Sequence, residues 1–375
     1  MKEFNLENLK LTKYLFFTGK GGVGKTSAAC ATAVTLADEG KRVLLISTDP
    51  ASNLQDVFAT ELNGEAKPIK EVDNLEVINL DPLEAAQNYK ESVVAPFRGK
   101  MPDSVIENME EQLSGSCTVE IAAFNEFSNF ITNPKLNTEY EHIIFDTAPT
   151  GHTLRMLQLP SAWTGFISES THGASCLGQL SGLEAKKEIY KKAVENLSDG
   201  SLTTLVLVTR PDNTPLKEVA RASKELSEIG IKNQILEING LLEKYDDELS
   251  ESIYKKQKLA LENMPDMLTE FDTYTIALRS YNITGIESIR NLLKKDQINE
   301  EKEEVKGKLF NLDDVVSDLI KNNRKVIFTM GKGGVGDSDI MMTDTINPLK
   351  SKFKGFHKTF KQDDLGLSLS YFLLN

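Results

Sequence analysis

The residues GKGGVGKT, 19–26, are the most informative motif of this 375-residue chain. It fits the pattern G-x-x-x-x-G-K-[ST] and stands between an apolar run, Tyr14–Thr18, and a helical pattern, Lys25–Glu39. Glycines let successive backbone N–H groups converge on phosphate oxygens, and the start of a helix adds the positive end of its dipole. The stretch therefore predicts a phosphate-binding loop between the first strand and the first helix of an α/β domain. A glycine-rich turn without a ligand is the alternative.

The loop and the residue after it supply the candidates for nucleotide binding. Lys25 is expected to reach the β- and γ-phosphates, and the Thr26 hydroxyl is expected to face Mg²⁺. ATP and Mg²⁺ are therefore the predicted cofactors. The candidate residues are Gly19, Lys20, Gly21, Gly22, Val23, Gly24, Lys25, Thr26 and Ser27.

Outward from the loop, short apolar runs alternate with longer amphipathic stretches. This alternation is typical of βαβ units and predicts an α/β fold with a mainly parallel twisted sheet flanked by helices. The expected strands are Tyr14–Thr18, Val43–Ser47, Leu75–Leu80, His142–Asp146, Leu202–Thr209 and Gln234–Asn239. The expected helices are Lys25–Glu39, Ser104–Ile131, Leu180–Asn196, Pro215–Ile229 and Glu248–Glu262. Residues 83–136 lie between two expected strands and are predicted to form a helical insertion.

The first domain is expected to span residues 1–293, because a charged, apolar-poor stretch follows at 294–308. We expect a linker over 294–323. The run KYLFFTGKGGVG (13–24) returns as KVIFTMGKGGVG (325–336), which predicts the start of a second domain at 324–336. Asp337 and Ser338 replace the lysine and threonine of the first loop, so this second loop is not expected to bind a triphosphate. Residues 337–375 are expected to be an anomalous tail without a folded domain, of a composition consistent with frameshifting or splicing.

Composition and charge exclude several classes of protein. With 40% hydrophobic and 26% charged residues the chain resembles an ordinary globular protein. A formal net charge of −13 argues against a nucleic-acid-binding surface, which needs a basic face. No apolar run approaches the roughly 20 residues that span a bilayer, and the acidic start of the chain does not predict export. The three cysteines lie far apart, so a disulfide framework is not expected, and the cytoplasm is the predicted location.

Two aspartates follow expected strands and are candidates for metal and water chemistry. HIIFDTAP (142–149) ends an apolar strand in Asp146, where a carboxylate can hold Mg²⁺ through water. ISTDPASNL (46–54) puts Asp49 at the end of another strand, expected beside the phosphate loop, where it can orient the attacking water or contact the metal. A helix N-cap for Asp146 and a turn aspartate for Asp49 are the structural alternatives.

The sequence resembles the deviant P-loop ATPases, and within them the arsenical pump-driving ATPases. KGGVGKT, with its extra Lys20, resembles the loop of dimerising members, in which this lysine crosses to the partner's phosphates; a solvated loop lysine is the alternative. DTAPTGHTLRMLQLP (146–160) together with STDPASNL (47–54) resembles the arsenical pump-driving ATPases and the tail-anchored protein targeting factors. The resemblance covers residues of about 10–336. It implies that Asp49 activates water, that Asp146 lies on the metal side, and that Asn239 hydrogen-bonds adenine.

Two cysteine contexts resemble the metalloid sites of the arsenical pump-driving ATPases. LSGSCTVEIAAFNEF (113–127) contains Cys117, and HGASCLGQLSGLE (172–184) contains Cys176. The resemblance implies that both bind As(III) or Sb(III), which are soft ions suited to thiolates, as an allosteric ligand or a substrate. His152 matches a histidine near this site. Without the resemblance, a lone cysteine is more often a small buried hydrophobic residue.

The function implied is Mg-ATP hydrolysis coupled to As(III) or Sb(III) binding, with Asp49, Lys20 and Lys25 as catalytic residues. The protein would energise a membrane arsenite carrier in arsenical resistance. It would act in the cytoplasm or at the inner face of the plasma membrane. Full-length members carry two nucleotide domains, so either two copies of this chain pair or the activity is impaired. The alternative function is a targeting chaperone for tail-anchored membrane proteins. That role needs an exposed apolar groove and a C-x-x-C pair, and this sequence contains no C-x-x-C.

Overall fold

A computed structural model describes residues 1–49, 54–147 and 187–294 of the chain. It also describes residues 314, 317–318, 321–322, 326–332, 356–362 and 367–373. The chain forms two compact units, Met1–Lys295 and Asp296–Asn375.

The described part of the first unit is built on a nine-stranded sheet in the order β1-β9-β8-β7-β2-β6-β3-β5-β4. Its strands are β1 (Lys2–Glu3), β2 (Tyr14–Thr18), β3 (Val43–Ser47), β4 (Lys67–Pro68), β5 (Leu75–Asn79), β6 (His142–Asp146), β7 (Thr203–Thr209), β8 (Gln234–Leu241) and β9 (Thr273–Ala277). All neighbouring pairs are parallel except β4 and β5. The predicted α/β class with a mainly parallel sheet is confirmed.

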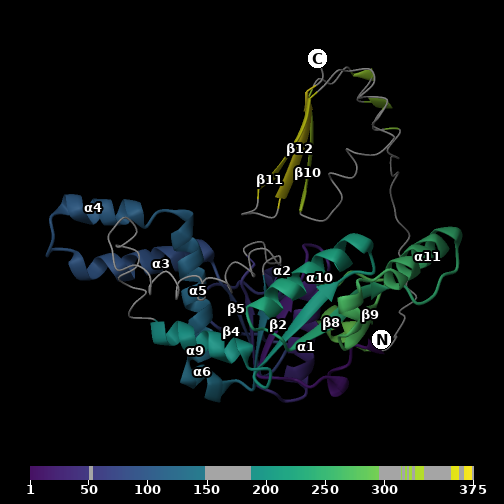
Figure 1. Cartoon of the computed structure of the whole chain (residues 1–375), viewed down its shortest axis with the longest axis horizontal. Coiled ribbons are helices and arrows are strands. Elements are labelled where there is room, and N and C mark those ends of the chain that lie inside the picture. The colour runs from purple at the N-terminus through teal and green to yellow at the C-terminus, as the bar shows by residue number, and fades with distance from the viewer. Residues whose placement is uncertain are drawn as a thin grey trace. The chain divides into compact units, whose positions relative to one another are not determined.

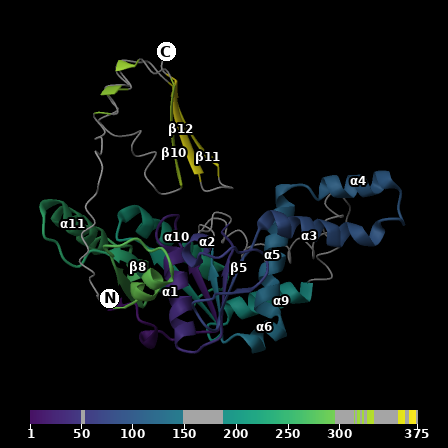
Figure 2. The same ribbon diagram turned by 180° about the vertical axis from the view of Figure 1, so that it is seen from behind.

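Helices cover both faces of this sheet (Figures 1 and 2). One face packs against α1 (Lys25–Asp38), α2 (Leu54–Phe58) and α13 (Ile286–Leu292). The other packs against α3 (Pro82–Val94), α5 (Ser116–Thr132), α9 (Lys187–Ser198), α10 (Asn213–Glu228), α11 (Glu248–Glu262) and α12 (Asp266–Thr269). The remaining described helices of this unit are η1 (Leu6–Asn8), η2 (Ala95–Phe97), α4 (Asp103–Gln112) and α6 (Pro134–Glu139).

The central strands are buried on both faces, which explains their continuous apolar sequences. In β2, Tyr14 and Phe16 contribute to the core on one face, and Leu15 and Phe17 contribute to the core on the other. The Phe16 ring stacks on Phe145 of β6 with centroids 4.4 Å apart. Because successive side chains of a strand point to opposite faces, one apolar run serves two cores.

Helices α3 to α6 fill the chain between β5 and β6, where a helical insertion was expected. In both views α4 lies at one end of this unit and α11 at the other (Figures 1 and 2). The prediction of one helix over Ser104–Ile131 is wrong, since α4 ends at Gln112 and α5 begins at Ser116. The break has a local cause: Gly115 has an extended backbone, with φ −77° and ψ 160°, directly before α5.

The strands predicted at Tyr14–Thr18, Val43–Ser47 and His142–Asp146 are confirmed with the same bounds. The start of the helix predicted at Leu180–Asn196 lies outside the described residues, and its remainder belongs to α9. Several elements were not predicted, among them β9 and α13. Both follow the last expected helix; β9 lies between β1 and β8 in the sheet, and α13 belongs to the same core as α1.

The second unit contains a three-stranded antiparallel sheet in the order β10-β12-β11. Its strands are β10 (Val326–Lys332), β11 (Phe356–Gln362) and β12 (Leu367–Leu373). Strand β10 carries the first part of the repeated sequence, and residues 333–336 of the repeat lie outside the described residues. Among the described helices of both units, none combines the length and the apolarity that crossing a membrane requires.

Candidate active site

The loop predicted from residues 19–26 joins the carboxyl end of β2 to α1. Helix α1 begins at Lys25, and Gly24 before it has a left-handed backbone with φ 97° and ψ 22°. Gly24 has no side chain that could cap the first turn of α1. The N–H groups of that turn are consequently suited to an anionic ligand held in the loop.

Two glycines of the loop allow close contacts that any side chain would prevent. A Cβ atom on Gly24 would lie 1.9 Å from Nδ2 of Asn239, and one on Gly19 would lie 2.1 Å from the carbonyl oxygen of Val208. The Asn239 amide itself donates to the carbonyl oxygen of Val23 at 2.9 Å. The loop is therefore packed directly against the ends of β7 and β8, and Asn239 is one of its contacts.

We expect Gly24→Ala to lower the affinity for a nucleotide at least about tenfold, because a left-handed backbone costs about 1–3 kcal/mol for an L side chain and the new methyl group displaces Asn239. Titration with a fluorescent ATP analogue measures the change. Gly40→Ala is the matched control, since Gly40 follows the other end of α1 with φ 86° and no atom within 4 Å of an added Cβ. Equal nucleotide affinities for the two variants would contradict the prediction.

The side chain of one loop lysine, Lys25, contacts the backbone of the other, Lys20. Lys25 is buried, with 6% of its surface exposed, and its Nζ donates to the carbonyl oxygen of Lys20 at 3.2 Å. The Lys20 ammonium forms an ion pair of 3.1 Å with Glu218 of α10. Both cationic groups that the motif supplies are thus held by oxygen atoms of this same chain.

Thr26 and Asp146 meet beside the loop. The Thr26 hydroxyl donates to Oδ2 of Asp146 at 2.8 Å, and Asp146 is fully buried. Asp146 ends β6, where it is in register with Phe17 of β2 and Ser47 of β3. A hydroxyl and a carboxylate so close together form the kind of oxygen pair that Mg²⁺ prefers.

Asp49 lies two residues beyond the end of β3, half-buried, and its backbone N–H donates to Oγ of Ser47 at 3.2 Å. The strand order places β6 between β2 and β3, so the strand that leads to Asp49 is not the immediate neighbour of the loop strand. Asp146 occupies the adjacent position instead.

The sequence model of the anion-transporting ATPases matches residues 12–297, which take in the loop, both aspartates and Asn239. The chain belongs to the anion-transporting ATPase family. Within this family it is 48% identical over 330 residues to an arsenical pump-driving ATPase of Acidiphilium multivorum, a match that covers 86% of this chain and 57% of that relative. It is 45% identical over 372 residues to an arsenical pump-driving ATPase of Escherichia coli, which covers 97% of this chain and 63% of that relative.

This anion-transporting ATPase chain thus spans about three-fifths of the length of these two relatives. It is also 32% identical over 312 residues to the ATPase GET3 of Lodderomyces elongisporus, with 75% of this chain and 89% of that relative covered. The similarity to the arsenical pump-driving ATPases is the greater of the two. The branch of the family that the cysteine contexts predicted is therefore favoured over the targeting alternative.

The three predicted metalloid ligands fall in or next to parts of the chain outside the structural description. Cys176 and His152 lie outside the described residues. Cys117 is placed by its backbone in the first turn of α5, and its side chain lies outside the description. Among the described residues, no group of three or more histidine, cysteine, aspartate or glutamate side chains could hold a metal ion.

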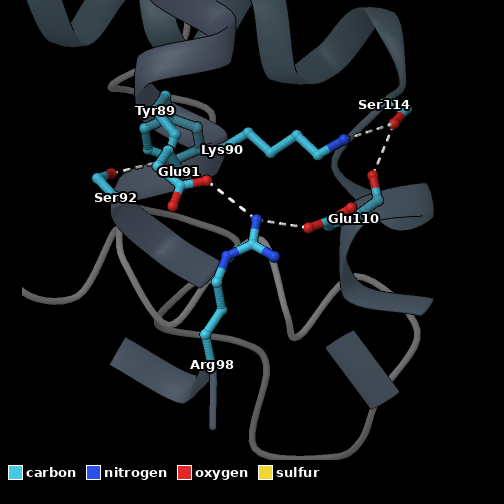
Figure 3. A network of polar contacts seen from close by, with 7 residues as sticks. All are labelled: Tyr89, Lys90, Glu91, Ser92, Arg98, Glu110 and Ser114. Atoms are coloured by element: carbon cyan, nitrogen blue, oxygen red, sulfur yellow. Dashed lines mark hydrogen bonds and ion pairs between the residues drawn. The ribbon is translucent and has the colours of Figure 1, made fainter. Parts of the chain in front are cut away.

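A polar network connects α3, α4 and the segment that leads into α5 (Figure 3). Arg98 pairs with Glu91 of α3 at 3.0 Å and with Glu110 of α4 at 2.7 Å. The Ser114 hydroxyl donates to the Glu110 carbonyl at 2.6 Å and lies 3.5 Å from Nζ of Lys90. Ser114 precedes α5 by two residues, so the network fixes the turn from which the backbone of Cys117 follows.

Sequence reasoning did not single out two glutamates of the domain. Glu218, in α10, resembles any other residue of a charged helix face, and nothing local indicates its contact with Lys20. Glu237 is fully buried in β8, and neither carboxylate oxygen has a hydrogen-bond partner among the described residues. Burial raises the pKa of Glu237 to about 8. The sequence did contain an indication of this buried carboxylate, because Glu237 is an acidic residue inside the apolar strand QILEIN, 234–239.

Proposed function

We propose that this chain hydrolyses Mg-ATP and couples hydrolysis to the binding of As(III) or Sb(III), and so energises a membrane arsenite carrier. The observation that carries the ATPase part is the contact between Thr26 and Asp146 beside the phosphate-binding loop. The metalloid part is supported by the similarity to proteins named arsenical pump-driving ATPases. The proposed location is the cytoplasm, with peripheral binding at the inner face of the plasma membrane.

In this proposal the loop acts as a cradle for the triphosphate. The N–H groups of residues 19–26 and the Lys25 ammonium would surround the phosphates, and Lys25 would exchange the Lys20 carbonyl for a phosphate oxygen. Asn239, which contacts Val23 under the loop, would hydrogen-bond adenine. Asp49 would orient the attacking water from its position after β3.

The residues present fit a magnesium ion. Thr26 and Asp146 would hold it, because a hydroxyl and a carboxylate 2.8 Å apart are hard oxygen ligands of the kind Mg²⁺ takes. The ion would neutralise charge that develops on the β- and γ-phosphate oxygens. Asp146 is in register with both β2 and β3, so its carboxylate is held by the sheet itself.

Metalloid coupling is proposed to run through Cys117, Cys176 and His152. Thiolates select soft ions, and α5 carries Cys117 at its start. Helix α5 packs with α3 and α9 on the sheet face that also buries Phe145, the residue before Asp146. A movement of α5 on metalloid binding would therefore bear on the strand that ends in the proposed magnesium carboxylate.

The domain organisation is also a proposal. We propose a first ATPase domain over residues 1–293, the start of a second at 324–336, and a phosphate site completed either by a second copy of the chain or by a second domain. Lys20 is the group proposed to cross. ATPase rates with and without antimonite, on protein whose oligomeric state is measured by sedimentation, test this. A strictly monomeric protein without stimulation would refute the paired arrangement.

We expect Cys117→Ser to abolish stimulation of the ATPase rate by antimonite and to leave ATP affinity unchanged, because a hydroxyl is a poor ligand for a soft ion. Cys30→Ala is the control. The Cys30 thiol is buried in α1, where burial and the nearby Asp146 charge raise its pKa, so it does not supply a thiolate ligand. Stimulation that survives in Cys117→Ser would assign the ligand role elsewhere.

A further inference from the structure

Two contacts hold Lys20 in place, one through its side chain and one through its backbone. Its ammonium lies 3.1 Å from Oε1 of Glu218, and its carbonyl oxygen accepts from Nζ of Lys25 at 3.2 Å. The two side chains of the ion pair are 38% and 39% exposed. The pair is therefore neither sequestered in the core nor free in solvent, and a ligand can compete for either partner.

The fold explains why Glu218 lies beside the loop. Strand β7 neighbours β2, and the two strands are parallel, so the elements that follow them begin at the same edge of the sheet. The loop follows β2, and α10 follows β7. The buried side chains of Leu216 and Val219 fix the rotation of α10 on the core.

The other end of this arrangement is also anchored. Asp212, directly before α10, pairs with Lys256 of α11 at 3.3 Å. The first turns of α10 are thus connected to α11 on one side and to the loop on the other. Glu218 belongs to a helix that is held in place, and Lys20 belongs to a loop that must adapt to its ligand.

We propose that Glu218 is the positioning residue of Lys20: it holds the lysine over α10 until a phosphate of a second copy or second domain displaces it. An ammonium group cannot keep both partners at full strength, because the Coulomb attraction falls with distance. The ion pair therefore opposes the crossing of Lys20. This inference rests on the proposed role of Lys20 in phosphate binding.

The size of the effect follows from the exposure of the pair. Exposed ion pairs contribute little, and their removal changes an equilibrium by a factor of roughly two to five. We expect Glu218→Gln to raise the ATPase rate without metalloid by about that factor. Added salt should raise the wild-type rate toward that of the variant, since salt screens exposed pairs.

The matched control is Glu225→Gln on the same helix. Glu225 pairs with Arg221, one turn earlier in α10, with an N–O distance of 3.7 Å, and among the described residues it forms no ion pair with the loop. Glu225→Gln removes the same charge from the same helix, so the ATPase rate of this variant should equal that of the wild-type chain. A rise of equal size in both variants would overturn the proposal, because it would reflect the charge of α10 and not Lys20.

A double-mutant cycle with Lys20→Ala separates the proposed role of Lys20 in hydrolysis from the proposed role of Glu218 in holding Lys20. Unchanged hydrolysis in Lys20→Ala would refute the proposed role of Lys20 itself. If Lys20→Ala lowers the rate, then Glu218→Gln should have no effect in the Lys20→Ala background. A rise that persists in that background, or no rise in the single variant, would overturn the role of Glu218 alone.

A second measurement serves if hydrolysis by the full chain is too slow to compare. Sedimentation with a non-hydrolysable ATP analogue reports the association of two copies. Glu218→Gln should associate at a chain concentration about two to five times lower than the wild-type chain, and Glu225→Gln should match the wild type. Equal association of all three proteins would overturn the proposal.

Discussion

Asp146→Asn should lower the Mg-dependent ATPase rate by about 100- to 1000-fold. The asparagine oxygen can still accept the Thr26 hydroxyl, so the contact of 2.8 Å can persist, but the negative charge is lost. The charge of a metal ligand contributes several kcal/mol to the stabilisation of a phosphoryl-transfer transition state, and each 1.4 kcal/mol is a factor of about ten in rate. Steady-state hydrolysis at saturating ATP measures the change.

Two controls accompany this variant. Asp81→Asn changes the N-cap residue of α3, where asparagine caps as well as aspartate, and should leave the rate unchanged. Removal of Mg²⁺ with a chelator should bring the wild-type rate down to that of Asp146→Asn. If the variant kept more than about a tenth of the wild-type rate, Asp146 would not be the metal-side carboxylate.

Glu237→Gln should remove a pH dependence of stability that the wild-type chain shows between about pH 5 and pH 8. The carboxyl group of Glu237 is fully buried, and burial raises its pKa from 4.5 to about 8. In this window the folded chain keeps a proton that the unfolded chain releases. The contribution of Glu237 to stability is therefore fully present at low pH and is lost as the pH rises through the folded pKa.

The expected size is large for one residue. Each pH unit in the window changes the free energy of unfolding by about 1.4 kcal/mol, so the loss between pH 5 and pH 8 is on the order of 4 kcal/mol. Glutamine resembles the neutral carboxyl in shape and does not titrate. The variant should match the wild type near pH 5 and exceed it above pH 8, in denaturant unfolding followed by circular dichroism.

Glu262→Gln provides the control, because Glu262 is an exposed residue at the end of α11 and its charge should matter little. Glu237→Leu extends the test, since it removes the buried polar group altogether and should stabilise the chain at every pH. A pH profile of Glu237→Gln that parallels the wild type would show that another group takes up the proton.

Much of the sheet could be predicted because its signal is local. Strands β2, β3 and β6 are short apolar runs bounded by polar residues, and they are buried on both faces as such runs require. The prediction of a single helix over Ser104–Ile131 was wrong at Gly115. The sequence has helical periodicity on both sides of this residue, so the extended backbone at Gly115 left no visible signal. Strand β9 has the same length as β2, β3 and β6 but was missed because it is half-exposed on alternate residues and lacks their continuous apolar run.

The candidate site was also predictable in part. The types and spacing of the loop residues predicted a phosphate cradle, and the ends of strands predicted the carboxylates Asp49 and Asp146. Sequence could not tell which carboxylate lies next to the loop, since that depends on the strand order β2-β6-β3. The metalloid ligands Cys117, Cys176 and His152 stay predictions, as does the role of Lys20 across a pair of domains.

By itself, the sequence determined the chemistry of the loop, because GKGGVGKT needs only its own glycines, lysine and threonine at fixed spacing to suit a phosphate. Which distant groups contact the loop became visible only in the folded chain. Asp146 reaches Thr26, Asn239 lies against Gly24, and Glu218 pairs with Lys20. The physical reason is that strand order and helix rotation come from burying two cores at once, and no local pattern of residues records that long-range packing.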